Sequence, residues 1–251
     1  MEAPMKTDTH RLPESTSECT AQGMYNFIKF DDICSSPLFR DFTEEEFYAL
    51  LSTMNSYAAD FEKDAYIYRA GDIVRSLGFV LSGSVRIENI DLAGNRRILG
   101  QAMKNDVFAE AYAYLKNQPL LVDVAANEKC TILFLKVSEN PALDNIPERI
   151  IIKLQRNLLH IANMKSLRLS IRNLHTSSRS IRDRITSFLS TQVLQHGSSE
   201  FSIPFDRQQM ADYLNLDRSS LSRELGKMKT EGLIDFHKNT FIIKTDFDSC
   251  L

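Results

Sequence analysis

The chain has 251 residues, of which 43% are hydrophobic and 25% are charged, and its net charge is −3. This length allows two domains, and the composition is that of an ordinary globular protein rather than of a disordered or globally basic one. No apolar run approaches the about 20 residues of a membrane helix, and no secretion signal opens the chain, so we expect a cytoplasmic protein without a membrane partner.

The first elements follow a polar N-terminal segment. Residues 1–24 are rich in Pro, Ser, Thr and Glu, which predicts a loose segment without a core. A helix is expected to begin after Thr43, because Thr43 can cap its first turn and Glu46, three residues later, can complete a capping box.

Short apolar runs separated by glycine and by Asp or Asn turns fill residues 66–137. Strands this short, at such regular spacing, predict a small antiparallel barrel or roll. The runs include Tyr66–Tyr68, Leu77–Leu81, Val85–Ile87 and Arg97–Leu99. The glycines at 71, 83 and 94 indicate corners that need positive φ or close approach of two backbones.

The four cysteines, at positions 19, 34, 130 and 250, form no CxxC pair. This spacing argues against a zinc ribbon or a thioredoxin-like site, so no metal site is predicted. Free thiols are expected in a reducing cytosol, with Cys130 inside a strand. Redox sensing remains the alternative.

A long helix is predicted from Glu148 to about His175, with Pro147 suited to its first turn. Its apolar positions approximate a 3–4 repeat and predict a parallel two-helix dimer interface. The predicted interface residues are Ile151, Leu154, Leu158 and Ile161. The alternative is a helix buried on its own domain. Residues 175–180 are interpreted as a hinge, followed by a helix from Ile181 through Leu189.

Residues 202–244 predict two short helices joined by a tight turn and followed by a hairpin, which is a winged helix-turn-helix. Asp206 can cap the first helix in a capping box with Gln209, and Asp217 can cap the second. Buried positions are expected at Met210, Ala211 and Leu214, and at Leu221, Leu225 and Met228. Gly232 stands where a helix would stop, and Lys238-Asn239 is the hairpin turn.

The outward face of the second helix carries the functional prediction. Removing the buried positions leaves Arg218, Ser219, Ser222 and Arg223 on one side of the first two turns, as a helix that enters the major groove requires. Arginine can bond guanine O6 and N7 in parallel. Arg207 and Gln208 are expected to hold the phosphate backbone. The alternative is a helical hairpin whose arginines are solvated.

These motifs resemble the CRP/FNR family of bacterial regulators. The effector-domain motifs are GD at 71–72, FVLSGSVRI at 79–87, DxxG at 91–94 and DVFAE at 106–110, and SRELGKMKTEGLID at 222–235 is similar to the family's DNA-binding helix and wing. The resemblance implies an α+β fold with an N-terminal antiparallel, jelly-roll-like β-roll sensor domain, a long dimerisation helix and a C-terminal winged helix-turn-helix. The implied boundaries are a flexible segment at 1–24, the sensor domain at 25–145, the dimerisation helix at 146–176 and the DNA-binding domain at 177–251.

Within the resemblance, Arg223 matches the arginine that typically contacts guanine. Ser219 stands where many members carry a glutamate that accepts from cytosine, so the usual half-site of the family is not assumed. A parallel dimer would place its two recognition helices about 34 Å apart, which predicts a pseudo-palindromic operator.

The resemblance also bears on the effector. Glu110 matches the glutamate that binds the ribose of cyclic AMP, but Leu120 and Leu121 replace the Arg-Ser/Thr pair that holds the phosphate. Burying a phosphate without a cation costs several kcal/mol, so cyclic nucleotides are not the expected effector. The candidate pocket is apolar and aromatic, or else the same residues fill the core of the roll. They are Phe108, Glu110, Tyr112, Tyr114, Leu120 and Leu121.

The FNR branch of the family carries an iron–sulfur cluster on closely spaced N-terminal cysteines. Cys19, Cys34 and Cys130 have the wrong spacing for this, so no cluster is predicted. A haem sensor remains an alternative, because histidine ligands have no fixed signature, but His160 and His175 are interpreted as surface or hinge residues of the dimer helix and haem is not the prediction.

The sequence therefore predicts a dimeric, sequence-specific transcription regulator controlled by a small-molecule or redox signal. The expected partners are double-stranded DNA, a second copy of the chain, RNA polymerase and an unidentified small-molecule effector. The alternative is a cyclic-nucleotide-binding signalling module. No Ser/His/Asp order, glycine-rich phosphate loop or metal motif supports an enzyme.

Overall fold

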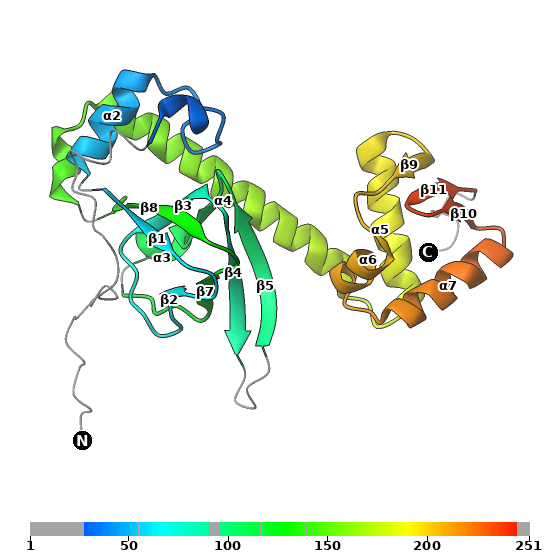
Figure 1. Cartoon of the computed structure of the whole chain (residues 1–251). Coiled ribbons are helices and arrows are strands. Elements are labelled where there is room, and N and C mark those ends of the chain that lie inside the picture. Colours follow the sequence, from blue (N-terminus) through cyan, green and yellow to red (C-terminus); the bar gives the residue numbers. More distant parts are fainter. Residues whose placement is uncertain (1–27, 55, 91–95, 116, 139, 245–251) are drawn as a thin grey trace. The chain divides into compact units, whose positions relative to one another are not determined.

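The computed structural model describes residues 28–54, 56–90, 96–115, 117–138 and 140–244, and the chain divides into two compact units, Met1–Asn163 and Met164–Leu251. Figure 1 shows the elements of both units. The predicted segment 1–24, Cys19, Gly94 and Cys250 lie outside the described residues.

The first unit contains two antiparallel four-stranded sheets. One has the order β1-β8-β3-β6 and the other the order β2-β7-β4-β5. The strands of the first sheet are β1 (Tyr57–Phe61), β8 (Cys130–Leu135), β3 (Leu77–Ser82) and β6 (Val107–Phe108). Those of the second are β2 (Tyr66–Tyr68), β7 (Asp123–Ala126), β4 (Ser84–Ile90) and β5 (Arg96–Met103). The predicted antiparallel roll is confirmed.

Apolar side chains from both sheets meet in one core. Alternate residues of each strand point into it, as the period of two requires: Val80 and Ile132 from one sheet pack with Val85 and Val124 from the other. Gly83, between β3 and β4, has φ +72 and lies against the backbone of residues 129–130, as the predicted corner required.

Helices cover the outer face of the first sheet and form a second core with it. They are η1 (Phe30–Asp32), α2 (Glu44–Thr53), η2 (Pro141–Asn145) and the first part of α4 (Glu148–Thr176). The predicted capping box at the start of α2 is confirmed, since Glu46 N–H donates to Thr43 Oγ1 at 3.2 Å and Thr43 N–H donates to Glu46 Oε2 at 3.1 Å. A short helix, α3 (Glu110–Tyr114), follows β6.

α4 begins directly after Pro147, whose carbonyl accepts the first helical bond from Ile150 N–H at 2.8 Å. The boundary between the two units falls inside this helix, at residues 163 and 164. The sequence instead placed boundaries at its two ends. The difference arises because the first turns of α4 pack in the core of the first unit, whereas its last turn contacts α6 of the second.

The second unit contains α5 (Ile181–His196), β9 (Glu200–Ser202), α6 (Arg207–Tyr213), α7 (Arg218–Thr230), β10 (Ile234–His237) and β11 (Thr240–Ile243). α5 runs seven residues beyond the predicted Leu189 and ends at Gly197, which has φ +63. The predicted hairpin is confirmed, and β9 extends it to a three-stranded sheet of order β10-β11-β9. Two residues of β9 are exposed, so its apolar pattern was too short to reveal a strand.

Candidate nucleic-acid interface

The first helix of the helix-turn-helix, α6, is fixed at both its start and its inner face. Asp206 and Gln209 form the predicted capping box, with both of its hydrogen bonds at 2.8 Å. Met210, Ala211 and Leu214 are completely buried. These contacts satisfy the free amides of the first turn and anchor α6 in the core of the unit.

The second helix, α7, is set by the turn before it. Asn215 takes the left-handed conformation, with φ +53, and Asp217 occupies the N-cap position. Its carboxylate makes no capping hydrogen bond, so the predicted side-chain cap is absent. α7 is instead anchored by Leu221, Leu225 and Met228, all fully buried, and Gly232 ends it with φ +78, as predicted.

The opposite face of α7 is exposed at its N-terminal end. Arg218, Ser219, Ser222 and Arg223 all face solvent, and the first three line a shallow hollow. Within the described residues, neither arginine makes a hydrogen bond or an ion pair. The two guanidinium groups therefore keep all their donors for an external partner, in the geometry that suits guanine or phosphate.

Arg207, expected to contact phosphate, lies half-buried against the wing, which consists of β10, β11 and the turn Lys238-Asn239. Its Nη2 donates to the carbonyl of Lys238 at 3.0 Å, and its guanidinium lies 5.0 Å from the centre of the Phe236 ring and 5.6 Å from that of Phe241. Burial lowers the pKa of Arg207. Arg207 therefore ties α6 to the wing, a role that the sequence did not indicate.

Gln208 is exposed, as a contact to the phosphate backbone of DNA requires, but its side chain already makes a hydrogen bond within α6. Its Nε2 donates to Asp212 Oδ1 at 2.9 Å, one turn later on α6. This is an ordinary stabilising pair at i and i+4.

Other arginines of this unit hold it together through hydrogen bonds within the chain. Arg182 on α5 bonds Glu224 at 2.6 Å and bonds both carboxylate oxygens of Glu231 at 2.7 and 2.9 Å. These bonds, first to Glu231 and then to Glu224, raise the pKa of Arg182. Arg184 donates to the carbonyls of Ser178, Leu214 and Asn215. The partners are distant in sequence, so no local pattern could have identified them.

In the first unit, the six candidate effector residues do not gather into one site. Phe108 and Leu120 belong to the core between the sheets, so the alternative reading, core filling, applies to them. Tyr112 packs partly against that core, and Glu110 is half-buried. Tyr114 and Leu121 are exposed.

The scatter has a simple physical reason. The chain bends at Leu121 before β7 begins at Asp123, and Leu120 is 2% exposed while Leu121 is 67% exposed. α3 has only five residues, and Ala113 is its buried one. The six candidates lie on β6, on a helix of one turn and on the segment after it, and these elements do not direct them into one cavity.

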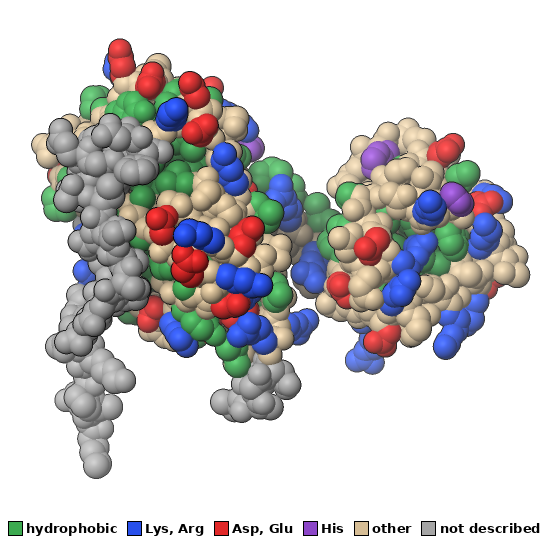
Figure 2. All heavy atoms as spheres, viewed as in Figure 1, with side chains coloured by type: hydrophobic (Ala, Val, Ile, Leu, Met, Phe, Trp, Pro, Cys, Tyr) green, Lys and Arg blue, Asp and Glu red, His purple; other side chains and the backbone are tan. Residues whose placement is uncertain are grey.

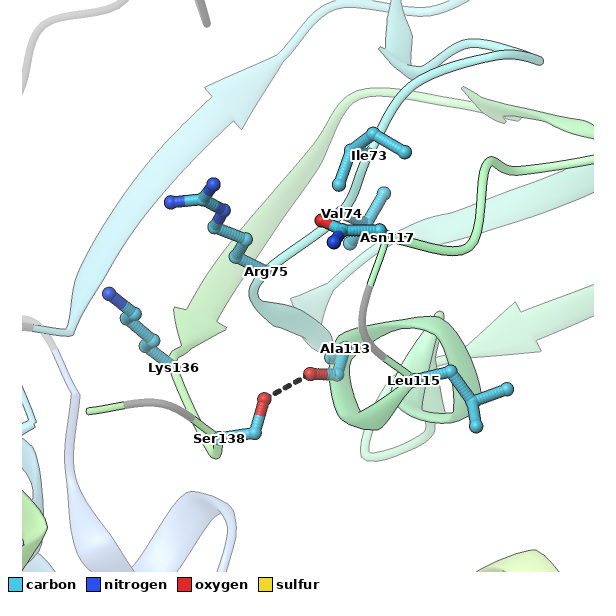
Figure 3. Close-up of a pocket in the computed structure, with 8 residues that line it drawn as sticks. All are labelled: Ile73, Val74, Arg75, Ala113, Leu115, Asn117, Lys136 and Ser138. Carbon is cyan, nitrogen blue, oxygen red and sulfur yellow. Dashed lines mark hydrogen bonds between the residues drawn. The ribbon is translucent and has the colours of Figure 1, made fainter. Parts of the chain in front are cut away.

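A pocket does lie beside α3, and Figure 3 shows its lining residues. None of them was among the candidates. They are Ile73, Val74, Arg75, Ala113, Leu115, Asn117, Lys136 and Ser138. The hydroxyl of Ser138 donates to the carbonyl of Ala113 and joins the end of β8 to α3.

The two described cysteines are both free thiols. Cys34 is exposed, and Cys130, in β8 as predicted, is buried. Burial, with the carboxylates of Asp60 and Glu128, raises the pKa of Cys130 to about 11. A thiol that stays protonated at neutral pH is a poor nucleophile and metal ligand.

Charge on the first unit is mixed. Figure 2 shows Lys and Arg side chains interspersed with Asp and Glu on the visible face of this unit. Within the described residues, no group of three or more His, Cys, Asp or Glu side chains could hold a metal ion. Among the described helices, none combines the length and the apolar character that crossing a membrane demands.

Two family models match the chain, one in each unit. The model of the cyclic nucleotide-binding domain matches residues 59–141, and that of the Crp-like helix-turn-helix domain matches residues 183–248. The first match covers the strands of the roll, and the second covers α5 to the wing.

The chain is also similar to two curated proteins and to a solved structure. The chain is 24% identical over 191 residues to Electron transport regulator A of Shewanella oneidensis, covering 74% of this chain and 73% of that protein. It is 36% identical over 52 residues to the transcriptional activator protein FnrL of Cereibacter sphaeroides, covering 21% of each. The solved structure of CprK complexed with OCPA is similar in fold, with a TM-score of 0.52 at 19% identity over 81% of this chain and 90% of that one.

The models of the cyclic nucleotide-binding domain and of the Crp-like helix-turn-helix domain both match within this one chain. Proteins of the CRP/FNR family are transcription regulators and not enzymes. The chain belongs to the CRP/FNR family of DNA-binding transcription regulators.

Proposed function

We propose that this regulator reads a specific DNA sequence with the N-terminal turns of α7 in the major groove. The observation that supports this most is a pair of guanidinium groups, Arg218 and Arg223, that have no partner within the described residues and lie on a helix whose other face is completely buried. A rigid helix presenting two such forks can discriminate guanine from other bases. Ser219 and Ser222 leave room for close approach between them.

DNA selected from a random pool identifies the site, and two alanine variants then test the reading residues. Each bidentate arginine–guanine pair contributes about 1–3 kcal/mol of discrimination, so Arg218→Ala and Arg223→Ala each weaken binding to the selected duplex by roughly 10- to 100-fold. The preference for the selected duplex over random duplex also falls, because specificity is lost along with affinity.

Arg97→Ala is the matched control, since Arg97 is an exposed arginine on β5 of the first unit. It removes the same charge and leaves binding to the selected duplex unchanged. If the variant lacking both Arg218 and Arg223 stays folded by circular dichroism and still binds that duplex with full affinity, α7 is not the reading helix.

The regulator acts as a homodimer through α4. Leu154 and Leu158, two of the predicted interface residues, are 2% and 5% exposed in the single chain because they pack in its own core. Ile151 and Ile161 are half-buried against the same core. These residues leave little surface for a partner, so the alternative weighed from the sequence, burial on the chain's own domain, applies to this face of α4.

A different apolar stripe remains exposed on α4. Ile152, Leu159, Leu167 and Leu174 all face solvent and follow one another at spacings of seven, eight and seven residues. A spacing of two turns places them along one side of the helix, as a helix–helix seam requires. We assign the dimer interface to this stripe, which makes the expected operator a pseudo-palindrome.

The signal sensed by the roll is a small molecule or a redox change, and not cyclic AMP. The position where the family places its phosphate-binding arginine is Leu120, which is buried in the core and offers no donor. A phosphate there would lose its water without gaining a cation, at a cost of several kcal/mol. Cyclic AMP and cyclic GMP therefore give no heat in isothermal titration with the full chain.

The match to a cyclic nucleotide-binding domain supports one other candidate, a signalling module that binds such a nucleotide. The same titration separates the two, because a micromolar dissociation constant for either nucleotide would establish the alternative. The proposed regulator works in the cytoplasm, where RNA polymerase is its expected protein partner.

A further inference from the structure

The last turn of α4 contains a buried histidine. His175 is 1% exposed, and its ring packs edge-on to Phe188 of α5 at 5.5 Å between centres and against the ring of Tyr213 of α6 at 5.8 Å. The residue was interpreted from the sequence as a surface or hinge position. The structure instead places it among three helices of the second unit.

The hydrogen bonds of His175 fix its tautomer. Thr191 Oγ1 donates its own hydrogen to the carbonyl of Ser187 at 3.0 Å, so it accepts from His175 Nε2–H at 2.8 Å. Nδ1 is then without a hydrogen and accepts from the hydroxyl of Tyr213 at 3.0 Å. The imidazole is neutral, and each of its nitrogens has one partner.

A second side chain from the end of α4 reaches the same part of α6. Arg172 Nε donates to the carbonyl of Tyr213 at 3.2 Å, and Arg172 Nη2 donates to that of Asp212 at 3.3 Å. The guanidinium also lies 5.7 Å from the centre of the Tyr213 ring. A cation at the carbonyl end of a helix is favourably placed. Both bonds go to carbonyls at this end of α6, and that of Asp212 also accepts from Asn215 N–H at 3.3 Å.

We propose that His175 and Arg172 are positioning residues that lock the end of α4 onto α6, and that protonation of His175 opens this lock and weakens DNA binding. This inference rests on the proposed DNA-binding function. The contacts of the lock are to Asp212 and Tyr213, immediately before the turn at Asn215. This turn sets the direction of α7.

Protonation disrupts the lock because the imidazolium has a hydrogen on both nitrogens. Nδ1–H must then donate to the oxygen of Tyr213, whose own hydroxyl hydrogen loses its acceptor in a buried place. Among the described residues, the ring and hydrogen-bonding partners of His175 include no carboxylate to balance the new charge. Arg172, whose guanidinium lies 5.7 Å from the centre of the Tyr213 ring, is a further positive group on the same tyrosine.

Burial lowers the pKa of His175 below its ordinary value of 6.5. The unfolded or released state therefore binds the proton more readily than the locked state does. The stabilisation is complete above pH 6.5 and is lost progressively as the pH falls below it.

The test measures binding of the full chain to a fluorescent duplex, the one recovered by selection, by anisotropy between about pH 5 and pH 8. The wild-type chain is therefore expected to lose affinity progressively as the pH falls below 6.5. His175→Gln keeps an amide donor for Thr191 and cannot take up a proton. It binds at the upper pH within about threefold of wild type and has a flatter pH profile.

Two further substitutions separate His175 from other titrating groups. His160 is exposed on α4, and His237 is exposed at the end of β10 in the wing. His160→Gln and His237→Gln therefore retain the wild-type decline at low pH. If either of them removes the decline and His175→Gln does not, the inference is overturned.

Hydrogen–deuterium exchange of residues 207–216 in the DNA-free chain, corrected for the intrinsic pH dependence, gives a readout that needs no DNA. Exchange in wild type rises as the pH falls below 6.5, and in His175→Gln it does not. If His175→Gln does not fold, Tyr213→Phe is used instead. This variant is expected to exchange fast already at neutral pH, and its exchange rises less than that of wild type as the pH falls. If exchange depends on pH equally in wild type and variants, the lock is overturned. If exchange depends on pH as expected but selection recovers no DNA sequence, only the proposed DNA-binding function is overturned.

Discussion

At the level of single residues, the arginines of the second unit have two different roles. Arg182 and Arg207 are engaged by carboxylates, carbonyls or aromatic rings of their own chain. Arg218 and Arg223 have no such partners within the described residues. What separates them is the neighbouring surface. The start of α7 presents small serines, whereas Arg182 faces two glutamates and Arg207 faces two phenylalanines.

Gly83 provides the first prediction. A Cβ at this position would lie 2.5 Å from the carbonyl oxygen of Lys129 and 2.7 Å from Cys130 Cβ, and the residue has φ +72. Gly83→Ala is therefore expected to destabilise the first unit by about 1–3 kcal/mol, through backbone strain and displacement of the adjacent strand. Scanning calorimetry of the full chain measures the shift.

Gly100→Ala is the control for this prediction. Gly100 is in β5 of the same unit, has no positive φ, and a Cβ there would meet nothing within 4 Å. The same added methyl group leaves the unfolding temperature nearly unchanged. Equal unfolding temperatures for the two variants would mean that Gly83 is not constrained.

At the level of elements, the wing and α6 behave as one piece because Arg207 bonds the turn and stacks on both wing strands. A partly desolvated cation–π contact and a charged hydrogen bond each contribute about 1–2 kcal/mol. Arg207→Ala is therefore expected to lower the stability of the second unit by roughly that amount. It also weakens DNA binding about equally for the selected and the random duplex, because the wing loses its fixed position.

Gln208→Ala is the matched control for Arg207→Ala. Gln208 is the next residue of α6, and its one side-chain bond, to Asp212, is an exposed pair on the helix surface. Such a pair contributes only a few tenths of a kcal/mol, so this variant unfolds at nearly the wild-type temperature. A drop as large as that of Arg207→Ala would show that the wing contact is not the cause.

At the level of the whole molecule, the oligomeric state depends on which face of α4 is free. Leu159→Glu together with Leu167→Glu places two charges on the exposed stripe and is expected to convert the proposed dimer into a monomer, because neither carboxylate finds a partner in an apolar seam. Light scattering after size exclusion then gives a mass of 28.7 kDa instead of twice that value.

Leu194→Glu is the control for this change. Leu194 is 84% exposed on α5, away from the stripe, and the substitution leaves the dimer intact. A double variant that remains dimeric while Leu194→Glu becomes a monomer would place the interface on α5 instead.

Local patterns in the sequence determined the elements and the reading face. The capping boxes at Thr43 and Asp206, the glycine corners and the buried spacing of α7 each depend on residues a few positions apart. Such short-range rules hold wherever the segment lies, so the roll, the helix-turn-helix and the exposure of Arg218 and Arg223 could be predicted.

Tertiary structure decided which of several equivalent faces is covered. Leu154 and Leu159 are equally apolar, but only Leu154 meets the core of the first unit. Arg207 and His175 likewise found partners 31 and 38 residues away, at the wing and on α6. A helical repeat determines which residues share a side of α4. Whether that side is buried depends on what the rest of the chain packs against it, and such packing is set by long-range contacts alone.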